Sequence, residues 1–203
     1  MRCFAIGLIL VKCVTLEVNE ASHDCGANWK EIIPTFPSDS RPLMGLEQAL
    51  ARLSDGRLLA VCWTYDQHSG KSLLNRWSWS KDEGRHFSPP EFAPIHGETC
   101  RPLGIEGDHV VFVYRRVDQP GLWAHLASIK DDQWQPLEDI LLWNGLASEQ
   151  PTVGHGTIEK MSQLRFGCPA LLQMRDGSVF VVFWCVEDCV SVIRWLRLEV
   201  STI

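Results

Sequence analysis

The chain has 203 residues, of which 45% are hydrophobic and 22% charged, and its formal net charge is −6. This length and balance are typical of one globular domain with a substantial core. A mildly acidic chain without a basic run argues against nucleic acid as the main partner. Nine tryptophans stand against two tyrosines, which indicates a heavily buried core or surfaces that stack on flat or sugar-like ligands.

The first segment, MRCFAIGLILVKC, is similar to a signal peptide in its Arg2 and its apolar run. However, Lys12 interrupts the run and no clean small-residue cleavage site follows it. The run is also too short to span a bilayer, so no membrane span is predicted. Its continuation, VKCVTLEVN, alternates as a strand does, and we expect a strand that begins abruptly, as if an earlier part were missing. The compartment, cytoplasmic or exported, stays open.

Helical periodicity is nearly absent from the rest of the chain. Residues 42–53 fit either a short amphipathic helix or a strand with a bulge. The remaining short apolar runs are bounded by Gly, Asp and Pro, which predicts an all-β fold. Three runs share one design, a proline-containing segment followed by a glycine turn and a hydrophobic strand. Their strands are LSDGRLLAVCW (53–63), IEGDHVVFVYRR (105–116) and MRDGSVFVVFWC (174–185), and the proline segments are SRPLMG (40–45), TCRPLG (99–104) and GCPALLQ (167–173).

A second repeated pattern is the octet S-x-D-x-G-x-x-aromatic. It occurs at 22–29 as SHDCGANW and at 80–87 as SKDEGRHF, and a shortened form without glycine occurs at 128–134 as SIKDDQW. In such a turn the Asp side chain accepts backbone N–H groups, and glycine supplies a positive φ. The serine hydroxyl adds a local hydrogen bond, and the aromatic residue packs beneath the turn. Repeats at a period of roughly 40–50 residues indicate the blades of a β-propeller.

The octet resembles the Asp-box, or BNR repeat, of sialidases (neuraminidases) and related six-bladed β-propellers, over roughly residues 15–200. The resemblance implies a single sialidase-like β-propeller domain over 1–203, with three to four four-stranded antiparallel blades of an incomplete six-bladed propeller. The implied blades are 1–38 (partial), 39–93, 94–145 and 163–203. In this family the boxes are structural turns on the side away from the active site, so Asp24 and Asp82 are assigned to folding.

The family's site contains three arginines that hold the sialic acid carboxylate, an Asp acid/base, and a Tyr nucleophile paired with a Glu. Planar guanidinium groups suit an anionic sugar because they donate two parallel hydrogen bonds. The segments SRPLMG and TCRPLG resemble the family's first arginine segment. The residues implied are Arg41, Arg101 and one of Arg115 and Arg116 for substrate binding with Trp184, and Asp118, Tyr114 and Glu187 for catalysis.

Several of these assignments have a structural alternative. Arg101 either binds a carboxylate or caps backbone carbonyls, and Glu98 is either its ion-pair partner or a site acid. Arg115 and Arg116 face opposite ways, since neighbouring residues of a strand do. The turn that carries Glu187 and Asp188 is either a site loop or an ordinary acidic turn. Further tryptophans at strand ends, Trp63 and Trp123, are candidate sugar platforms, whereas Trp29 and Trp134 are interpreted as packing residues.

The cysteines and histidines predict no metal or cofactor. None of the eight cysteines forms a C-x-x-C pair, and His96 and His125 lack a second ligand at metal-like spacing. Cys185 and Cys189 either form a disulfide across a tight hairpin or stay free.

The chain departs from the family in two ways. It is shorter than the roughly 300 residues that six units of this spacing need, and its last repeat has no tyrosine and carries Cys168 where an arginine is expected. The leading hypothesis is a sialidase-like glycoside hydrolase, or part of one, acting on a terminal acidic sugar of glycans. The alternatives are a non-catalytic carbohydrate- or protein-binding propeller module and a truncated product without function alone. Self-association or missing N-terminal blades would close the propeller.

Overall fold

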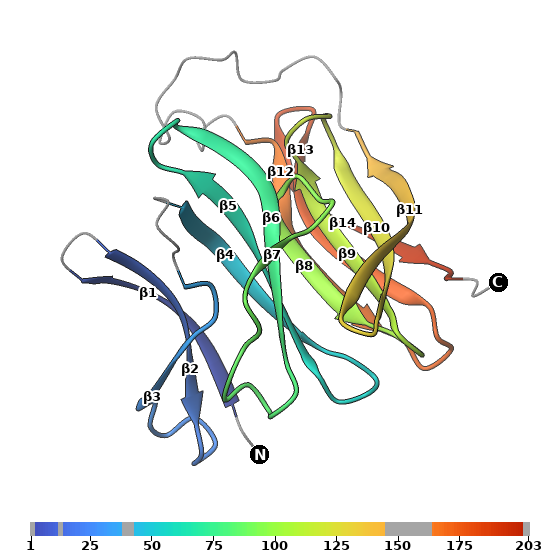
Figure 1. Ribbon diagram of the computed structural model, residues 1–203. Coiled ribbons are helices and arrows are strands. Elements are labelled where there is room, and N and C mark those ends of the chain that lie inside the picture. Colours follow the sequence, from blue (N-terminus) through green and yellow to red (C-terminus); the bar gives the residue numbers. More distant parts are fainter. Residues whose placement is uncertain (1–2, 12–13, 38–42, 145–163, 201–203) are drawn as a thin grey trace.

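A computed structural model describes residues 3–11, 14–37, 43–144 and 164–200, with the backbone alone described in 3–11 and 14–19. Every regular element in these ranges is a β-strand (Figure 1). Consequently no helix in the described ranges is long and apolar enough to cross a membrane. The prediction of an all-β fold is confirmed.

The strands form four antiparallel sheets in chain order. The first sheet contains β1 (Cys3–Val11), β2 (Val14–Ser22) and β3 (Glu31–Pro34). The second contains β4 (Leu43–Arg52), β5 (Leu58–Asp66), β6 (Lys71–Ser80) and β7 (Glu91–Phe92). The third contains β8 (Gly97–Gly104), β9 (His109–Arg116), β10 (Leu122–Lys130) and β11 (Gln133–Trp143). The fourth contains β12 (Phe166–Gln173), β13 (Val179–Glu187) and β14 (Val190–Leu198).

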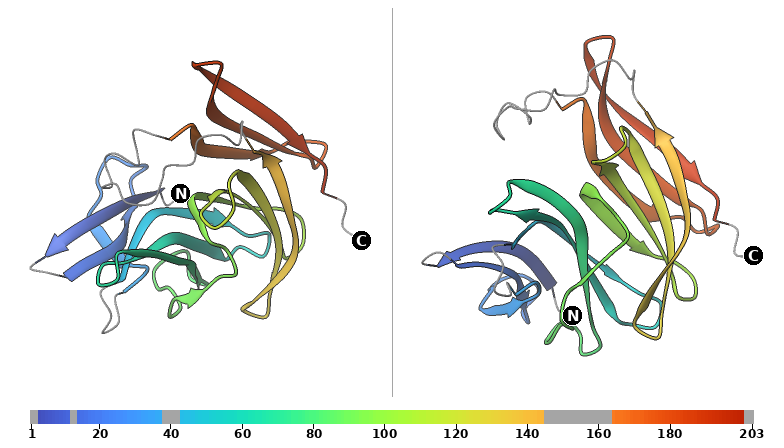
Figure 2. Two further views of the ribbon diagram at one scale, coloured as in Figure 1. Left: turned by 90° about the horizontal axis from the view of Figure 1, so that it is seen from above. Right: turned by 45° about the horizontal axis from the view of Figure 1, so that its top comes forward.

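The sheets follow one another face to face, and the first strands of the last three sheets lie side by side (Figures 1 and 2). One core fills the space between the second and third sheets and includes Val61, Trp77 and Phe112. Another fills the space between the third and fourth sheets and includes Val113 and Val181. The strands of the third sheet, β9 above all, therefore send alternate side chains into two different cores, which explains the continuous apolar run at 110–114.

Each of these inner strands has a bulge at the same place. The register of β4, β8 and β12 shifts by one residue, and the residue that follows the last regular pair has a positive φ: 50° at Glu47, 51° at Thr99 and 47° at Cys168. Residues 42–53 were predicted as either a helix or a bulged strand, and the bulged strand is confirmed from Leu43 onward.

The bulges fix which residues of the repeats are equivalent. The first regular pairs after the bulge are Ala49 with Val61, Arg101 with Val113, and Ala170 with Val182. Arg101 therefore corresponds to alanine in the two neighbouring sheets. Matching SRPLMG to TCRPLG was wrong for this reason, because the bulge and not the proline sets the register. Arg41 lies outside the described residues.

Two long loops, between β2 and β3 and between β6 and β7, have the same hydrogen bonds. In the first, Gly26 N–H donates to Ser22 Oγ at 2.8 Å and Asn28 N–H donates to Asp24 Oδ1 at 2.8 Å. The loop at 80–87 repeats this, with Gly84 N–H to Ser80 Oγ at 2.8 Å and His86 N–H to Asp82 Oδ1 at 2.9 Å. Both glycines have positive φ, 91° and 75°.

The structure adds a contact that the octet did not predict. The seventh side chain also bonds the aspartate: Asn28 Nδ2 lies 2.6 Å from Asp24 Oδ2, and His86 Nδ1 lies 2.6 Å from Asp82 Oδ2. Phe87 packs against the small core that contains Phe36. Both loops thus join two strands, and the loop at 80–87 also fixes its aromatic side chain, as the sequence predicted. Trp29 of the first loop is 38% exposed and belongs to no core cluster of the described residues, so its interpretation as a packing residue was wrong.

The shortened motif at 128–134 has a different conformation. Asp131 and Asp132, with φ of 50° and 60°, form a two-residue turn between Lys130 and Gln133. Neither carboxylate takes the place of Asp82, since Asp132 bonds Arg57 and Lys81 instead. Trp134 still packs inward, stacked on Phe112 at 4.4 Å between ring centroids.

No residue that the structure describes covers one face of the fourth sheet. Leu172, Ile193 and Trp195 are 61%, 68% and 64% exposed, and Phe180 stacks on Trp195 at 5.6 Å.

Cys185 is buried and Cys189 exposed, and both are free thiols, so the disulfide alternative is wrong.

Candidate functional site

The predicted site residues gather toward one end of the sheets. Because consecutive strands run in opposite directions, every second turn lies at the same end of the sheets. The turns at 67–70, 117–121 and 188–189 lie at the end drawn uppermost in Figure 1, here called the upper end. The two serine–aspartate loops and the glycine turns at 53–57, 105–108 and 174–178 lie at the opposite, lower end. Asp118 follows β9, and Glu187 ends β13, so both lie at the upper end.

Alternation along β9 separates the two neighbouring arginines. Tyr114 belongs to the core shared with the second sheet, and Val113 belongs to the core shared with the fourth. Arg116 accordingly faces the second sheet and Arg115 the fourth, so the expectation that only one of them serves a given pocket is consistent with the geometry.

Arg115 joins the third sheet to the fourth. Its Nε donates to Glu98 Oε2 at 3.0 Å, its Nη2 forms a second bond with the same oxygen, and its Nη1 donates to the carbonyl of Phe166 at 3.2 Å. Glu98 is therefore the partner of Arg115, not of Arg101. Gly167 leaves room for this guanidinium, because a Cβ there would lie 2.8 Å from Nη1 and 3.7 Å from Trp184 Nε1.

Arg101, by contrast, reaches no carboxylate in the described residues. Its Nη1 donates to the carbonyl of Cys100 at 3.3 Å, and its side chain is half-buried on β8. Of the two alternatives predicted for Arg101, this contact matches the capping of a backbone carbonyl.

Arg116, Asp118 and Trp123 form a cluster that faces the second sheet. Arg116 Nε donates to Asp118 Oδ1 at 2.7 Å, and its guanidinium lies over the Trp123 ring, 4.7 Å from the centroid. The hydrogen bond from Arg116 lowers the pKa of Asp118, partial burial opposes this, and the nearby His96 contributes to the lowering. Asp118 is thus held as a carboxylate, 43% exposed, beside an indole.

Tyr114 points into the core instead of into this cluster. Its side chain is 2% exposed, and burial raises the pKa of its hydroxyl above the ordinary value. The ring packs on Gly97, where a Cβ would collide with it. A buried hydroxyl that resists ionisation is a poor nucleophile, so the assignment of Tyr114 stays a prediction without geometric support.

Glu187 is bound by an arginine of its own hairpin. Arg194 Nε lies 3.1 Å from both carboxylate oxygens. This hydrogen bonding lowers the pKa of Glu187, and burial opposes it. Glu187 lies on the fourth sheet, while Asp118 faces the second, so no described contact brings the two candidate acids together.

Sequence reasoning missed a polar group on the second sheet. Trp63 Nε1 donates to Ser72 Oγ at 2.6 Å, and Ser72 Oγ lies 3.2 Å from His96 Nε2. Trp63 also packs edge-to-face on Tyr65, 6.3 Å between centroids. The backbone carbonyl of His96 accepts a bond from Val117 N at 3.0 Å, which places this group next to the Asp118 turn. No motif links Ser72 with His96, so only the fold could reveal the pair.

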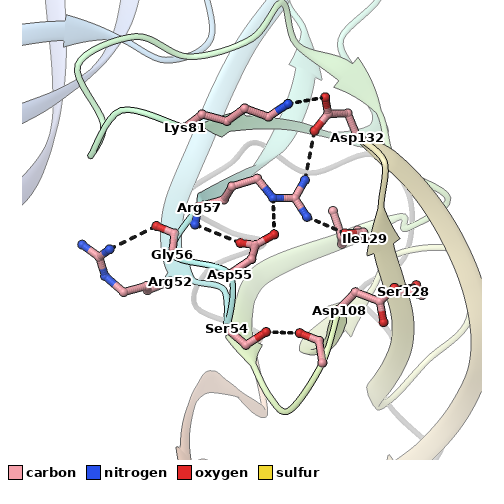
Figure 3. A network of polar contacts seen from close by, with 11 residues as sticks. Arg52, Ser54, Asp55, Gly56, Arg57, Lys81, Asp108, Ser128, Ile129 and Asp132 are labelled. Atoms are coloured by element: carbon pink, nitrogen blue, oxygen red, sulfur yellow. Dashed lines mark hydrogen bonds and ion pairs between the residues drawn. The ribbon is translucent and has the colours of Figure 1, made fainter.

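The lower end holds a polar cavity of about 960 Å³ between the second and third sheets. Arg57 is its central side chain: it donates to Asp55, to Asp132 and to the carbonyl of Ile129, and Lys81 bonds the same Asp132 (Figure 3). These groups satisfy one another, so they act as a bridge between sheets. Within the described ranges, no three His, Cys, Asp or Glu side chains gather closely enough to hold a metal ion.

Comparison with known proteins supports the fold alone. No protein-family model matches the sequence, and no curated protein matches it. Among solved structures, a protein of unknown function from Dyadobacter fermentans is similar over 98% of this chain and 50% of its own, with 19% identity and a TM-score of 0.71.

Two further similar structures are glycosidases. The NanB sialidase of Streptococcus pneumoniae matches 97% of this chain and 29% of its own, with 14% identity and a TM-score of 0.62. A GH43 β-1,3-galactosidase matches 97% of this chain and 43% of its own, with 11% identity and a TM-score of 0.61. The chain thus spans half or less of the length of these proteins, and its neighbours include sialidases and other glycoside hydrolases with β-propeller folds.

Proposed function

We propose that this chain is a sialidase-like, carbohydrate-active β-propeller module that binds a terminal acidic sugar at the upper end. Each of the four sheets is then one blade of a single domain, and further blades or a second chain close the ring. The observation that carries the proposal is the cluster of Arg116, Asp118 and Trp123, because it brings a cation, a carboxylate and an indole together around the turn between β9 and β10.

The chemistry of this cluster suits a sugar. An indole face packs on the apolar face of a pyranose ring, and a carboxylate accepts hydrogen bonds from sugar hydroxyls. Arg116 would hold the acidic group of the sugar once Asp118 releases part of its hydrogen bonding. Asp118 is the acid/base candidate. Arg41, Arg101, Trp184, Tyr114 and Glu187 remain predicted site residues.

A second candidate function is glycan binding without catalysis. It is favoured by the pairing of the upper-end arginines: Arg115 bonds Glu98, Arg116 bonds Asp118 and Arg194 bonds Glu187. An arginine triad that grips a substrate carboxylate needs unpaired guanidinium groups. The burial of Tyr114 points the same way.

A sialoside assay and a binding assay separate the two. We expect binding of a sialylated oligosaccharide, measured by calorimetry, that Arg116→Ala weakens at least tenfold, while Arg85→Ala at the lower end does not change it. Release of a fluorogenic aglycone from a sialoside, lost in Asp118→Asn, would support the hydrolase. Binding without turnover would support the non-catalytic module. The absence of both binding and turnover would refute the proposal.

A further inference from the structure

Ser72 and His96 form the arrangement that a nucleophile and its base require. Their Oγ and Nε2 atoms lie 3.2 Å apart, at the long end of the range over which a general base accepts a hydroxyl proton. The two residues come from different elements, the start of β6 and the segment before β8. Both side chains are half-buried, so neither is sealed in the core.

Trp63 sets the direction of the serine hydroxyl. An indole nitrogen can only donate, so Ser72 Oγ accepts the 2.6 Å bond from Trp63 Nε1. The hydroxyl hydrogen is then free to point at His96 Nε2, which accepts it in the tautomer protonated on Nδ1. One donor thus orients the nucleophile toward its base.

The backbone around His96 is held from two sides. Its carbonyl accepts the bond from Val117 N, and Gly97 N–H donates to Asn75 Oδ1 at 2.9 Å. These bonds tie the histidine to both neighbouring sheets. Trp63 and Tyr65 form an aromatic wall beside the pair.

We propose that Ser72 and His96 are the nucleophile and general base of an esterase site that removes O-acyl groups from sugars. The acyl-sugar class follows from position, because the pair adjoins the turn that carries Arg116 and Asp118. The inference concerns a reaction other than glycoside hydrolysis, and only the sugar part of the substrate rests on the proposed function.

The reaction balances with water as the second reactant. Ser72 Oγ attacks the ester carbonyl, its proton moves to His96 Nε2, and the bond from the acyl carbon to the sugar oxygen breaks. His96 returns that proton to the departing sugar oxygen. Water then attacks the acyl carbon of the acyl-serine and gives a proton to His96 Nε2. The bond from the acyl carbon to Ser72 Oγ breaks, His96 passes that proton to Oγ, and the carboxylic acid leaves with Ser72 and His96 restored.

A fluorophosphonate probe tests the pair directly, because such probes phosphonylate activated serines. We expect mass spectrometry of the labelled wild-type protein to locate the adduct on Ser72. Ser72→Ala should abolish labelling, and Ser69→Ala, three residues away in the adjoining turn, should label as the wild type does. His96→Gln should slow both labelling and hydrolysis of p-nitrophenyl acetate by about 10²-fold.

Trp63→Phe serves as a test of the positioning residue. It keeps an aromatic ring but removes the donor, so we expect slower labelling at unchanged thermal stability. No adduct on the wild-type protein, or an adduct on another serine, overturns the inference whether or not the variants fold. Labelling of Ser72 in a protein that neither binds nor cleaves sialosides would refute the proposed function alone.

Discussion

Arg57 Nη1 donates to Asp132 Oδ1 at 3.0 Å, and this bond joins the first turn of the second sheet to the last turn of the third. The Arg57 side chain is only 12% exposed, and it also bonds Asp55 and the carbonyl of Ile129. The same carboxylate receives Lys81, which is 58% exposed. The two cations that bond Asp132 therefore differ in burial, and burial decides how much each of them contributes to the free energy of unfolding.

We expect Arg57→Ala to lower the free energy of unfolding by about 2 kcal/mol, because it removes several charge-assisted hydrogen bonds. Lys81→Ala, at the other oxygen of Asp132, should cost less than about 1 kcal/mol. Urea denaturation measures both. Equal effects of the two substitutions would contradict the view that Arg57 is the bridge between the sheets.

The serine–aspartate loop at 80–87 makes a prediction about its seventh residue. Because Asn28 and His86 make the same contact with their aspartates, His86→Asn should leave thermal stability unchanged. Asp82→Ala removes the acceptor itself and should destabilise by about 1 kcal/mol. Arg85→Ala, whose exposed side chain has no described contact with Asp82, is the control. A large loss in His86→Asn would show that the two loops are not equivalent.

The first loop predicts a contribution to stability in acid. Hydrogen bonds, first of all from the Asn28 side chain, lower the pKa of Asp24 to about 2. Since folding depresses this pKa, the contribution is present above the unfolded value of 3.8 and is lost as the pH falls toward 2. The urea midpoint of Asp24→Asn should therefore approach that of the wild type between pH 4 and pH 2. If the urea midpoints of the two proteins keep a constant difference over this pH range, Asp24 is not the source of the stability that is lost in acid.

His125 predicts a second loss of stability on acidification, which begins at a higher pH than that of Asp24. Burial lowers its pKa, although its bond to Asp139 opposes this. Its Nε2 accepts the Trp134 indole N–H at 3.1 Å, so protonation there places two donors face to face. Because folding favours the neutral ring, this stability is present above the ordinary histidine pKa of 6.5 and falls as the pH drops below it. Thermal midpoints should decline less between pH 7.5 and 5.5 in His125→Gln than in the wild type, and an equal decline in both would contradict this prediction.

The uncovered face of the fourth sheet predicts self-association. Large exposed apolar patches mark interfaces, and Ile193 and Trp195 lie on adjacent pairs of that face. We expect the sedimentation coefficient to rise with protein concentration and Ile193→Glu to abolish the rise. Leu74→Glu, at an exposed position of β6, is the matched control. A concentration-independent monomer would contradict this prediction.

The sequence predicted the local geometry well where one short segment contains all the partners. Ser80, Asp82, Gly84 and Phe87 lie within eight residues, so their spacing alone indicated the turn and its hydrogen bonds. The motif at 128–134 lacks the glycine of the octet, and its residues pair as strands up to Lys130 and again from Gln133, so that only Asp131 and Asp132 form the turn. The equivalence of Arg41 and Arg101 failed because proline position does not reveal where a bulge shifts the register.

The alternation of hydrophobic and turn residues by itself determined that this chain forms short antiparallel strands, because apolar runs of strand length joined by short turns can pair only with neighbours that run the opposite way. Only the tertiary structure decided which charged groups meet. It paired Glu98 with Arg115, buried Tyr114 against Gly97, and brought Ser72 to His96 from another element. Side-chain pairs of this kind depend on how neighbouring sheets pack, and no short segment of the sequence contains a signal of that packing.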